Sequence, residues 1–147
     1  MKLLILEDTV HDLLFYRPLT NLTDAEINVL FFSPGKDFKE AQACDSYDTL
    51  HGKSLPWIKK CMEKTGADIV DFLKNNPYDF YIADSLEKLS NKFLEEAGIP
   101  KDKIAYLSST SSYRRLMQNY GYRAYRKADM EKLIKECLPL NALHKSE

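Results

Sequence analysis

Five short apolar runs recur along the chain, and each stops abruptly at a polar residue or a turn signal. They occupy residues 2–6, 27–32, 80–83, 104–107 and, more weakly, 122–126. A short, continuous apolar run with polar boundaries predicts a strand that is buried on both faces of a sheet. Such strands need helices on both sides to keep them from water. This requirement constrains the fold more than any other feature of the sequence.

Helical patterns lie between these runs. Apolar residues recur at helical spacing along residues 9–21, 86–97, 113–120 and 130–138. Gly98 and Gly121 are stop signals for two of these helices, and Asp129 is expected to cap the last one. Pro18 should kink or end the first. Strands that alternate with helices predict an α/β fold with a parallel sheet.

Five strand–helix units in 147 residues match a flavodoxin-like, doubly wound sheet. This fold has five parallel strands in the order 2-1-3-4-5, with helices on both faces. We expect one domain over residues 1–139 and a short tail over residues 140–147.

One stretch is too long for this alternation. About residues 36–65 are expected to form an insertion between the second strand and its helix. The spacing of apolar residues predicts helix over residues 58–62 and again over residues 69–73. The polar part should form a flap or an added contact surface beside the carboxyl ends of the strands, with Tyr47 and Trp57 as anchors.

Composition excludes several classes of protein. The net charge is −1, so no overall field attracts nucleic acid or an anionic membrane. No apolar run is long enough to span a bilayer or to serve as a signal peptide. The cysteines are odd in number and widely spaced, which indicates neither a disulfide framework nor a zinc site. A small, soluble, cytoplasmic protein is expected.

Chemically competent side chains follow four of the five predicted strands. Glu7 and Asp8 follow the first, Asp84 the third, Ser108 the fourth and Lys127 the fifth. The carboxyl ends of parallel strands meet at one edge of the sheet, where ligands bind in this class of fold. We therefore expect three carboxylates, a hydroxyl and an amine to converge there.

This set of groups suits phosphoryl transfer. Clustered carboxylates repel one another, and their hard oxygen atoms suit Mg²⁺. A carboxylate beside such a cation can attack phosphorus and form an aspartyl phosphate. A lysine would then neutralise charge on the phosphoryl oxygens, and a serine would donate a hydrogen bond to one of them.

The chain resembles the receiver domains of bacterial two-component response regulators, the CheY-like family. The motifs are LLILED at 3–8, GADIVDFL at 66–73, PYDFYIAD at 77–84, IAYLSS at 104–109 and YRK at 125–127. The resemblance implies that Glu7, Asp8 and Asp84 hold Mg²⁺ and that Asp84 is the phosphoacceptor. It also implies that Ser108 and Lys127 contact the phosphoryl group.

The chain departs from the family pattern after two of these positions. Ser85 and Leu86 follow Asp84 where the family has Met-Pro, and Ala128 follows Lys127 where the family has proline. The nearest candidates for the family's switch aromatic, Tyr122 and Tyr125, are out of register.

The resemblance implies a signalling domain, and we expect it to be stand-alone because the chain ends shortly after the predicted fifth helix. A histidine kinase or phosphotransfer protein would be the donor, and enzymatic activity would be limited to self-catalysed phosphorylation and dephosphorylation of Asp84. Residues 113–127 are basic and rich in tyrosine, and are expected to dock a protein partner or a second copy. No membrane or nucleic-acid partner is expected.

Two other functions remain open from the sequence. One is a phosphorylation-independent pseudo-receiver that binds protein or nucleic acid through the basic, tyrosine-rich segment. The other is a Mg²⁺-dependent phosphohydrolase of the haloacid-dehalogenase kind. Its nucleophile should follow the first strand in an Asp-x-Asp arrangement, which residues 7–10 do not supply.

Overall fold

Strands and helices alternate along the chain in a computed structural model. The model describes residues 1–7, 15–19, 22, 25–31, 58–64, 67–84 and 89–138. The strands are β1 (Lys2–Glu7), β2 (Glu26–Phe31), β3 (Ile58–Glu63), β4 (Phe80–Asp84), β5 (Ile104–Leu107) and β6 (Arg123–Tyr125). The helices are α2 (Ala67–Asn75), α3 (Leu89–Glu96), α4 (Ser111–Asn119) and α5 (Met130–Cys137), with 3-10 turns η3 (Lys101–Lys103) and η4 (Lys127–Asp129).

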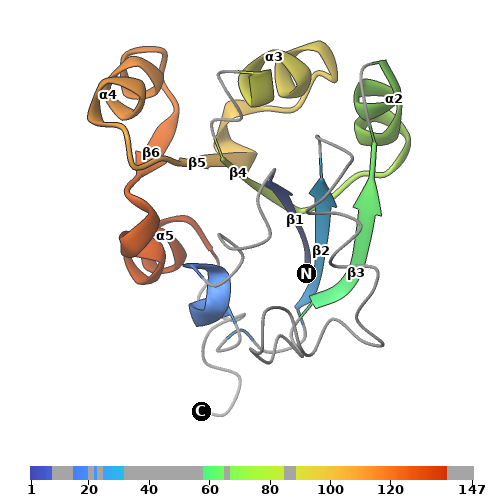
Figure 1. Ribbon diagram of the computed structural model, residues 1–147, viewed down its shortest axis with the longest axis horizontal. Helices are drawn as coiled ribbons and strands as arrows, with labels where there is room; N and C mark the ends of the chain where they lie inside the picture. Colours follow the sequence, from blue (N-terminus) through green and yellow to red (C-terminus); the bar gives the residue numbers. More distant parts are fainter. Residues whose placement is uncertain are drawn as a thin grey trace.

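The strands form one parallel sheet with the order β3-β2-β1-β4-β5-β6. Helices α2, α3 and α4 cover one face, while α5 and a short 3-10 turn over residues 15–19 cover the other (Figure 1). The five predicted strands are present in the predicted order, which confirms the doubly wound α/β fold class. With β3 included, the six strands have the order 3-2-1-4-5-6, which is the other common order of doubly wound sheets. The switch point of this order lies between β1 and β4.

The helical interpretation of residues 58–62 was wrong. Ile58–Glu63 forms the edge strand β3, which pairs with β2 in parallel and shifts register between Ile27 and Asn28. Helix begins only at Ala67, in agreement with the pattern over residues 69–73. Short apolar spacings do not distinguish a turn of helix from an edge strand, and tertiary pairing decided between them. Of the helix expected over residues 9–21, residues 15–19 form a 3-10 turn and the rest lies outside the described residues. The expected flap or contact surface with Tyr47 and Trp57 and the C-terminal tail also lie outside them.

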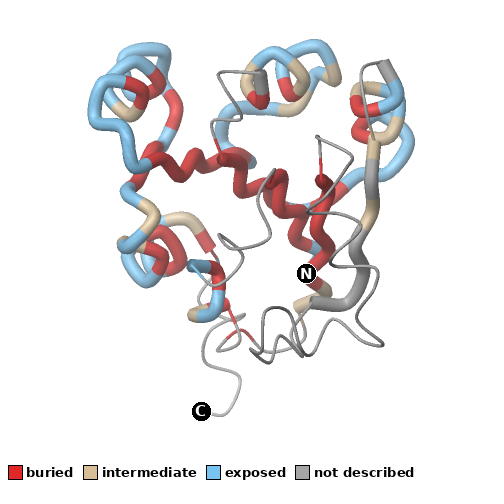
Figure 2. The backbone as a smooth tube through the Cα atoms, viewed as in Figure 1, coloured by how far each residue is buried: buried red, intermediate tan, exposed pale blue. Residues whose placement is uncertain are grey.

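Strand β1 lies between β2 and β4 at the centre of the sheet, and its residues from Leu3 onward are fully buried. Leu3 and Ile5 pack toward α5, whereas Leu4 and Leu6 pack toward α2, α3 and α4. Figure 2 shows the resulting arrangement, with buried strands at the centre and helices exposed on their outer sides. Each fully buried leucine or isoleucine contributes about 1.5–3 kcal/mol to stability.

Two glycines end helices in the way that the sequence predicts. After α3, the Gly98 N–H donates to the Glu95 carbonyl and the Ile99 N–H donates to the Leu94 carbonyl. This pair of bonds is a Schellman motif, which requires a left-handed backbone at its glycine. Gly98 has a φ of 75°, and Gly121 has a φ of 90° at the matching position after α4.

Replacing Gly98 with alanine tests this backbone requirement. A Cβ atom at Gly98 would have no heavy atom within 4 Å, so steric contact does not oppose the substitution. We expect Gly98→Ala to lower the free energy of unfolding by about 1–2 kcal/mol, because positive φ is unfavourable for alanine. Urea denaturation measures the loss. Lys92→Ala, at an exposed position of α3, is the control and should change stability little. Equal stability of Gly98→Ala and wild type would contradict this account.

Candidate functional site

Two predicted site residues lie side by side at the carboxyl edge of the sheet. Glu7 ends β1 and Asp84 ends β4, and these strands pair in parallel with Leu6 opposite Ala83. Each carboxylate is therefore one residue past the last position at which β1 and β4 pair, while Glu7 still pairs with β2 and Asp84 with β5. The chain leaves β1 and β4 toward opposite halves of the sheet, so this is the switch point where doubly wound sheets bind ligands.

Both carboxylates are buried. Glu7 has 0% of its surface exposed and Asp84 has 7%. Burying a charged carboxylate is costly unless a hydrogen bond, an opposite charge or a metal ion compensates for the lost water. The structure supplies a compensating group for each of them.

Lys127 compensates Asp84. Its Nζ atom lies 3.4 Å from Asp84 Oδ1, and the two side chains are 15% and 10% exposed. Lys127 begins η4, directly after the short strand β6, so the parallel pairing of β5 with β6 brings it to the same edge. The structure thus brings together these two predicted site residues.

Tyr16 compensates Glu7. Its hydroxyl donates a 3.2 Å hydrogen bond to Glu7 Oε1, and both residues are almost completely buried. The sequence analysis did not identify Tyr16 as part of the site. The only signal was an aromatic residue in the segment that follows the first strand, which does not distinguish a site residue from core.

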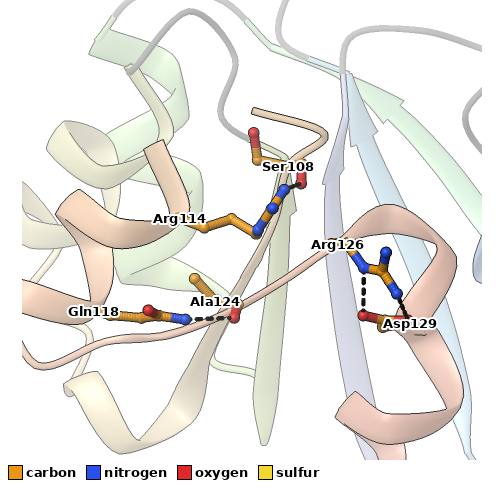
Figure 3. A network of polar contacts seen from close by, with 6 residues as sticks. All are labelled: Ser108, Arg114, Gln118, Ala124, Arg126 and Asp129. Atoms are coloured by element: carbon orange, nitrogen blue, oxygen red, sulfur yellow. Dashed lines mark hydrogen bonds and ion pairs between the residues drawn. The ribbon is translucent and has the colours of Figure 1, made fainter. Parts of the chain in front are cut away.

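Ser108 follows β5 and is buried at the same edge. Its backbone N–H donates to the Tyr125 carbonyl at 3.0 Å, which ties the end of β5 to β6. Its Oγ accepts the N–H of Thr110 at 3.1 Å, so the hydroxyl keeps its own proton to donate elsewhere. Arg114 reaches back from α4 and donates from Nη1 to the Ser108 carbonyl at 2.8 Å (Figure 3). Arg114 is a second residue that the sequence analysis missed.

A buried tyrosine of α4 lies near enough to Asp84 to be affected by its charge. Tyr113 packs with Ala83 and Tyr106 on the face covered by α2, α3 and α4. Burial raises the pKa of the Tyr113 phenol and the charge of Asp84 raises it further, while the Ser90 hydroxyl lowers it in part. The sequence analysis assigned Tyr113 only to the apolar stripe of its helix.

The carboxylates are the candidate metal ligands. Within the described residues, no group of three or more His, Cys, Asp or Glu side chains is placed to hold a metal ion. Of the three ligands expected for Mg²⁺, Glu7 and Asp84 are described, and Asp8 lies outside the described residues. Two hard oxygen donors on neighbouring strands fit Mg²⁺, which usually takes few protein ligands and keeps several waters.

An exposed ion pair flanks Lys127 in the chain, with Arg126 before it and Asp129 at the end of η4. Arg126 donates to Asp129 from Nε at 2.9 Å and from Nη2 at 3.1 Å (Figure 3). The hydrogen bond from Arg126 lowers the pKa of Asp129, and the same bond raises the pKa of Arg126. Asp129 occupies the N-cap position of α5, as predicted, but its side chain bonds to Arg126 and not to the helix backbone. The ion pair between Arg126 and Asp129 closes the turn that contains Lys127.

Comparisons with protein-family models, with curated proteins and with solved structures found no match to this chain. Among the described helices, none has both the length and the apolar character needed to cross a membrane.

Removing Lys127 tests the ion pair. We expect Lys127→Met to lower the free energy of unfolding by about 1–3 kcal/mol, because it leaves the Asp84 carboxylate buried without its partner. In an Asp84→Asn background the same substitution should cost clearly less. Chemical denaturation of the four proteins in this double-mutant cycle measures the difference.

The matched control is Lys132→Met, at an exposed position of α5, which should leave stability within experimental error in both backgrounds. If Lys127→Met costs the same with and without the Asp84 charge, the two side chains are not coupled.

Proposed function

We propose that this protein is a receiver-like signalling domain in which Asp84 accepts a phosphoryl group in a Mg²⁺-dependent reaction. The observation that supports it best is the arrangement around Asp84. This carboxylate lies at the switch point of a doubly wound sheet, 3.4 Å from the Lys127 amine and one strand away from the buried Glu7. Membership in the CheY-like family and a cytoplasmic location are parts of the same proposal.

Glu7, Asp8 and Asp84 would hold the cation in this proposal. Bound Mg²⁺ would neutralise the repulsion between the carboxylates and the charge on the incoming phosphoryl oxygens. The burial of Glu7 supports this role, because a fully buried carboxylate next to a second one favours a nearby cation.

Phosphoryl transfer would then proceed at Asp84. A carboxylate oxygen attacks the phosphorus atom of a phosphohistidine in a kinase or phosphotransfer protein. A P–O bond forms as the P–N bond breaks, and the departing imidazole nitrogen keeps the electron pair. Lys127 is already beside Asp84 Oδ1 and needs only a small movement to pair with a phosphoryl oxygen. Hydrolysis of the acyl phosphate would return the site to its starting state.

Ser108 would report the added charge. Its hydroxyl has a proton to donate, and its backbone is tied to β6 and to Arg114 of α4. A bond from Ser108 to a phosphoryl oxygen would therefore pull on both elements. Such a ligand-dependent bond shifts the balance between two conformations.

The docking face in this proposal is the basic, tyrosine-rich segment over residues 113–127. Leu116 is 38% exposed and Tyr120 is 53% exposed, and the exposed Arg115 and Arg123 lie in the same segment. Apolar side chains among arginines suit an acidic protein partner or a second copy of the chain.

A second candidate function is a pseudo-receiver that binds a partner without phosphorylation. The specific observation in its favour is that Lys127 and Tyr16 already compensate the two buried carboxylates. The same contacts would stabilise a scaffold with no reaction at Asp84.

Intact-mass spectrometry distinguishes the two functions. Incubation with Mg²⁺ and acetyl phosphate should add one phosphoryl group to the wild type. The group should be absent from Asp84→Asn and when EDTA removes Mg²⁺, because both the nucleophile and the cation are required. Lys127→Ala should reduce the fraction modified roughly 10-fold or more, as expected for loss of one group that stabilises charge in the transition state.

Asp71→Asn is the control, because Asp71 is an exposed carboxylate on α2, away from the strand ends. It should be modified as fully as the wild type. An unmodified wild type, or equal modification of Asp84→Asn, would favour the pseudo-receiver.

A further inference from the structure

Tyr113 carries a buried hydroxyl with unusual surroundings. The residue is 4% exposed, and its hydroxyl forms no hydrogen bond of ordinary geometry with any described residue, although the Ser90 hydroxyl lies near enough to lower the Tyr113 pKa. A buried donor without a well-formed bond costs stability, so its retention in a tightly packed core calls for a reason.

The position of Tyr113 links it to Asp84. Its ring packs edge-to-face on Tyr106, with ring centroids 6.1 Å apart. Tyr106 pairs with Ala83, the residue directly before Asp84, across β4 and β5. Burial is the main cause that raises the pKa of Tyr113, and the charge of Asp84 adds to it. The hydroxyl therefore lies within electrostatic reach of the proposed phosphoacceptor.

A chain of aromatic contacts leads from Tyr113 to the surface. Tyr106 also packs edge-to-face on Tyr122, with centroids 5.2 Å apart. The Tyr106 hydroxyl donates to Asn91 Oδ1 at 2.9 Å, and the Tyr122 hydroxyl donates to Glu95 Oε1 at 3.2 Å. Both acceptors lie on α3, so the three rings connect α4 and β5 with α3.

We propose that Tyr113 is a positioning residue that couples negative charge at Asp84 to α3 and α4 through Tyr106 and Tyr122. As the charge at Asp84 grows, the O–H of Tyr113 turns to donate to an oxygen of that site. The ring moves with it and shifts Tyr106, and through Tyr106 it shifts Tyr122. The bond is better in one charge state than in the other, which is the condition for a switch. Phosphorylation as the source of the charge rests on the proposed function, whereas the coupling itself does not.

Tyrosine labelled with ¹³C at the ζ carbon tests the coupling by NMR. The chain has 9 tyrosines, and single Tyr→Phe variants assign the signals. Asp84→Asn removes the charge, and we expect it to shift the signals of Tyr113, Tyr106 and Tyr122. Tyr78, which precedes β4 at the opposite end of that strand, is the internal control and should not move.

A second comparison separates coupling through Tyr113 from a general effect of charge. In Tyr113→Phe, the ring is retained and only the hydroxyl is lost. Adding Asp84→Asn to that variant should no longer shift Tyr106 and Tyr122. Asp71→Asn removes an exposed carboxylate and should leave all three signals unchanged in either background.

Two outcomes would overturn the proposal. One is a Tyr113 signal that does not respond to Asp84→Asn. The other is a shift of Tyr106 and Tyr122 that persists in Tyr113→Phe. Neither depends on phosphorylation, so failure of the mass measurement would remove the proposed function and leave this coupling to be judged by NMR alone.

Discussion

The parallel pairing of β1 with β4 is the constraint on which the rest of the structure depends. Residues 3–6 pair with residues 80–83 at the centre of the sheet, where both strands are buried on both faces. Burial of these apolar side chains supplies the favourable free energy, and the parallel direction carries Glu7 and Asp84 to the same edge. Two buried carboxylates are thereby held close together in spite of their repulsion. Lys127 and Tyr16 compensate the cost of burying these two carboxylates.

Most of the fold could be predicted from the sequence because both sheet faces are covered. Strands buried on both sides appear as uninterrupted apolar runs, and Gly98 and Gly121 mark helix ends whose backbone only glycine adopts easily. Strand β3 was missed for the opposite reason. It lies at the edge, pairs on one side only, and carries Lys59 and Lys60 in its middle, so its pattern lacks the apolar continuity of a central strand.

The candidate site was predictable only where the strand ends determine it. Asp84 and Lys127 were placed together because parallel strands end at one edge. Tyr16 and Tyr113 were not predicted to lie near the site, because no local sequence pattern encodes how their segments pack against the sheet. They approach from opposite faces: Tyr16 packs in the core under α5, and Tyr113 in the core under α2, α3 and α4. A buried tyrosine therefore packs on each face of the sheet.

The most direct test of this account is whether the two carboxylates form one cation site. Thermal unfolding measured with increasing Mg²⁺ reports binding, because a ligand of the folded state raises the melting temperature. The account predicts a rise for the wild type and for the control Asp71→Asn, and none for Glu7→Gln or Asp84→Asn. No rise in the wild type, or an equal rise in Asp84→Asn, would contradict it.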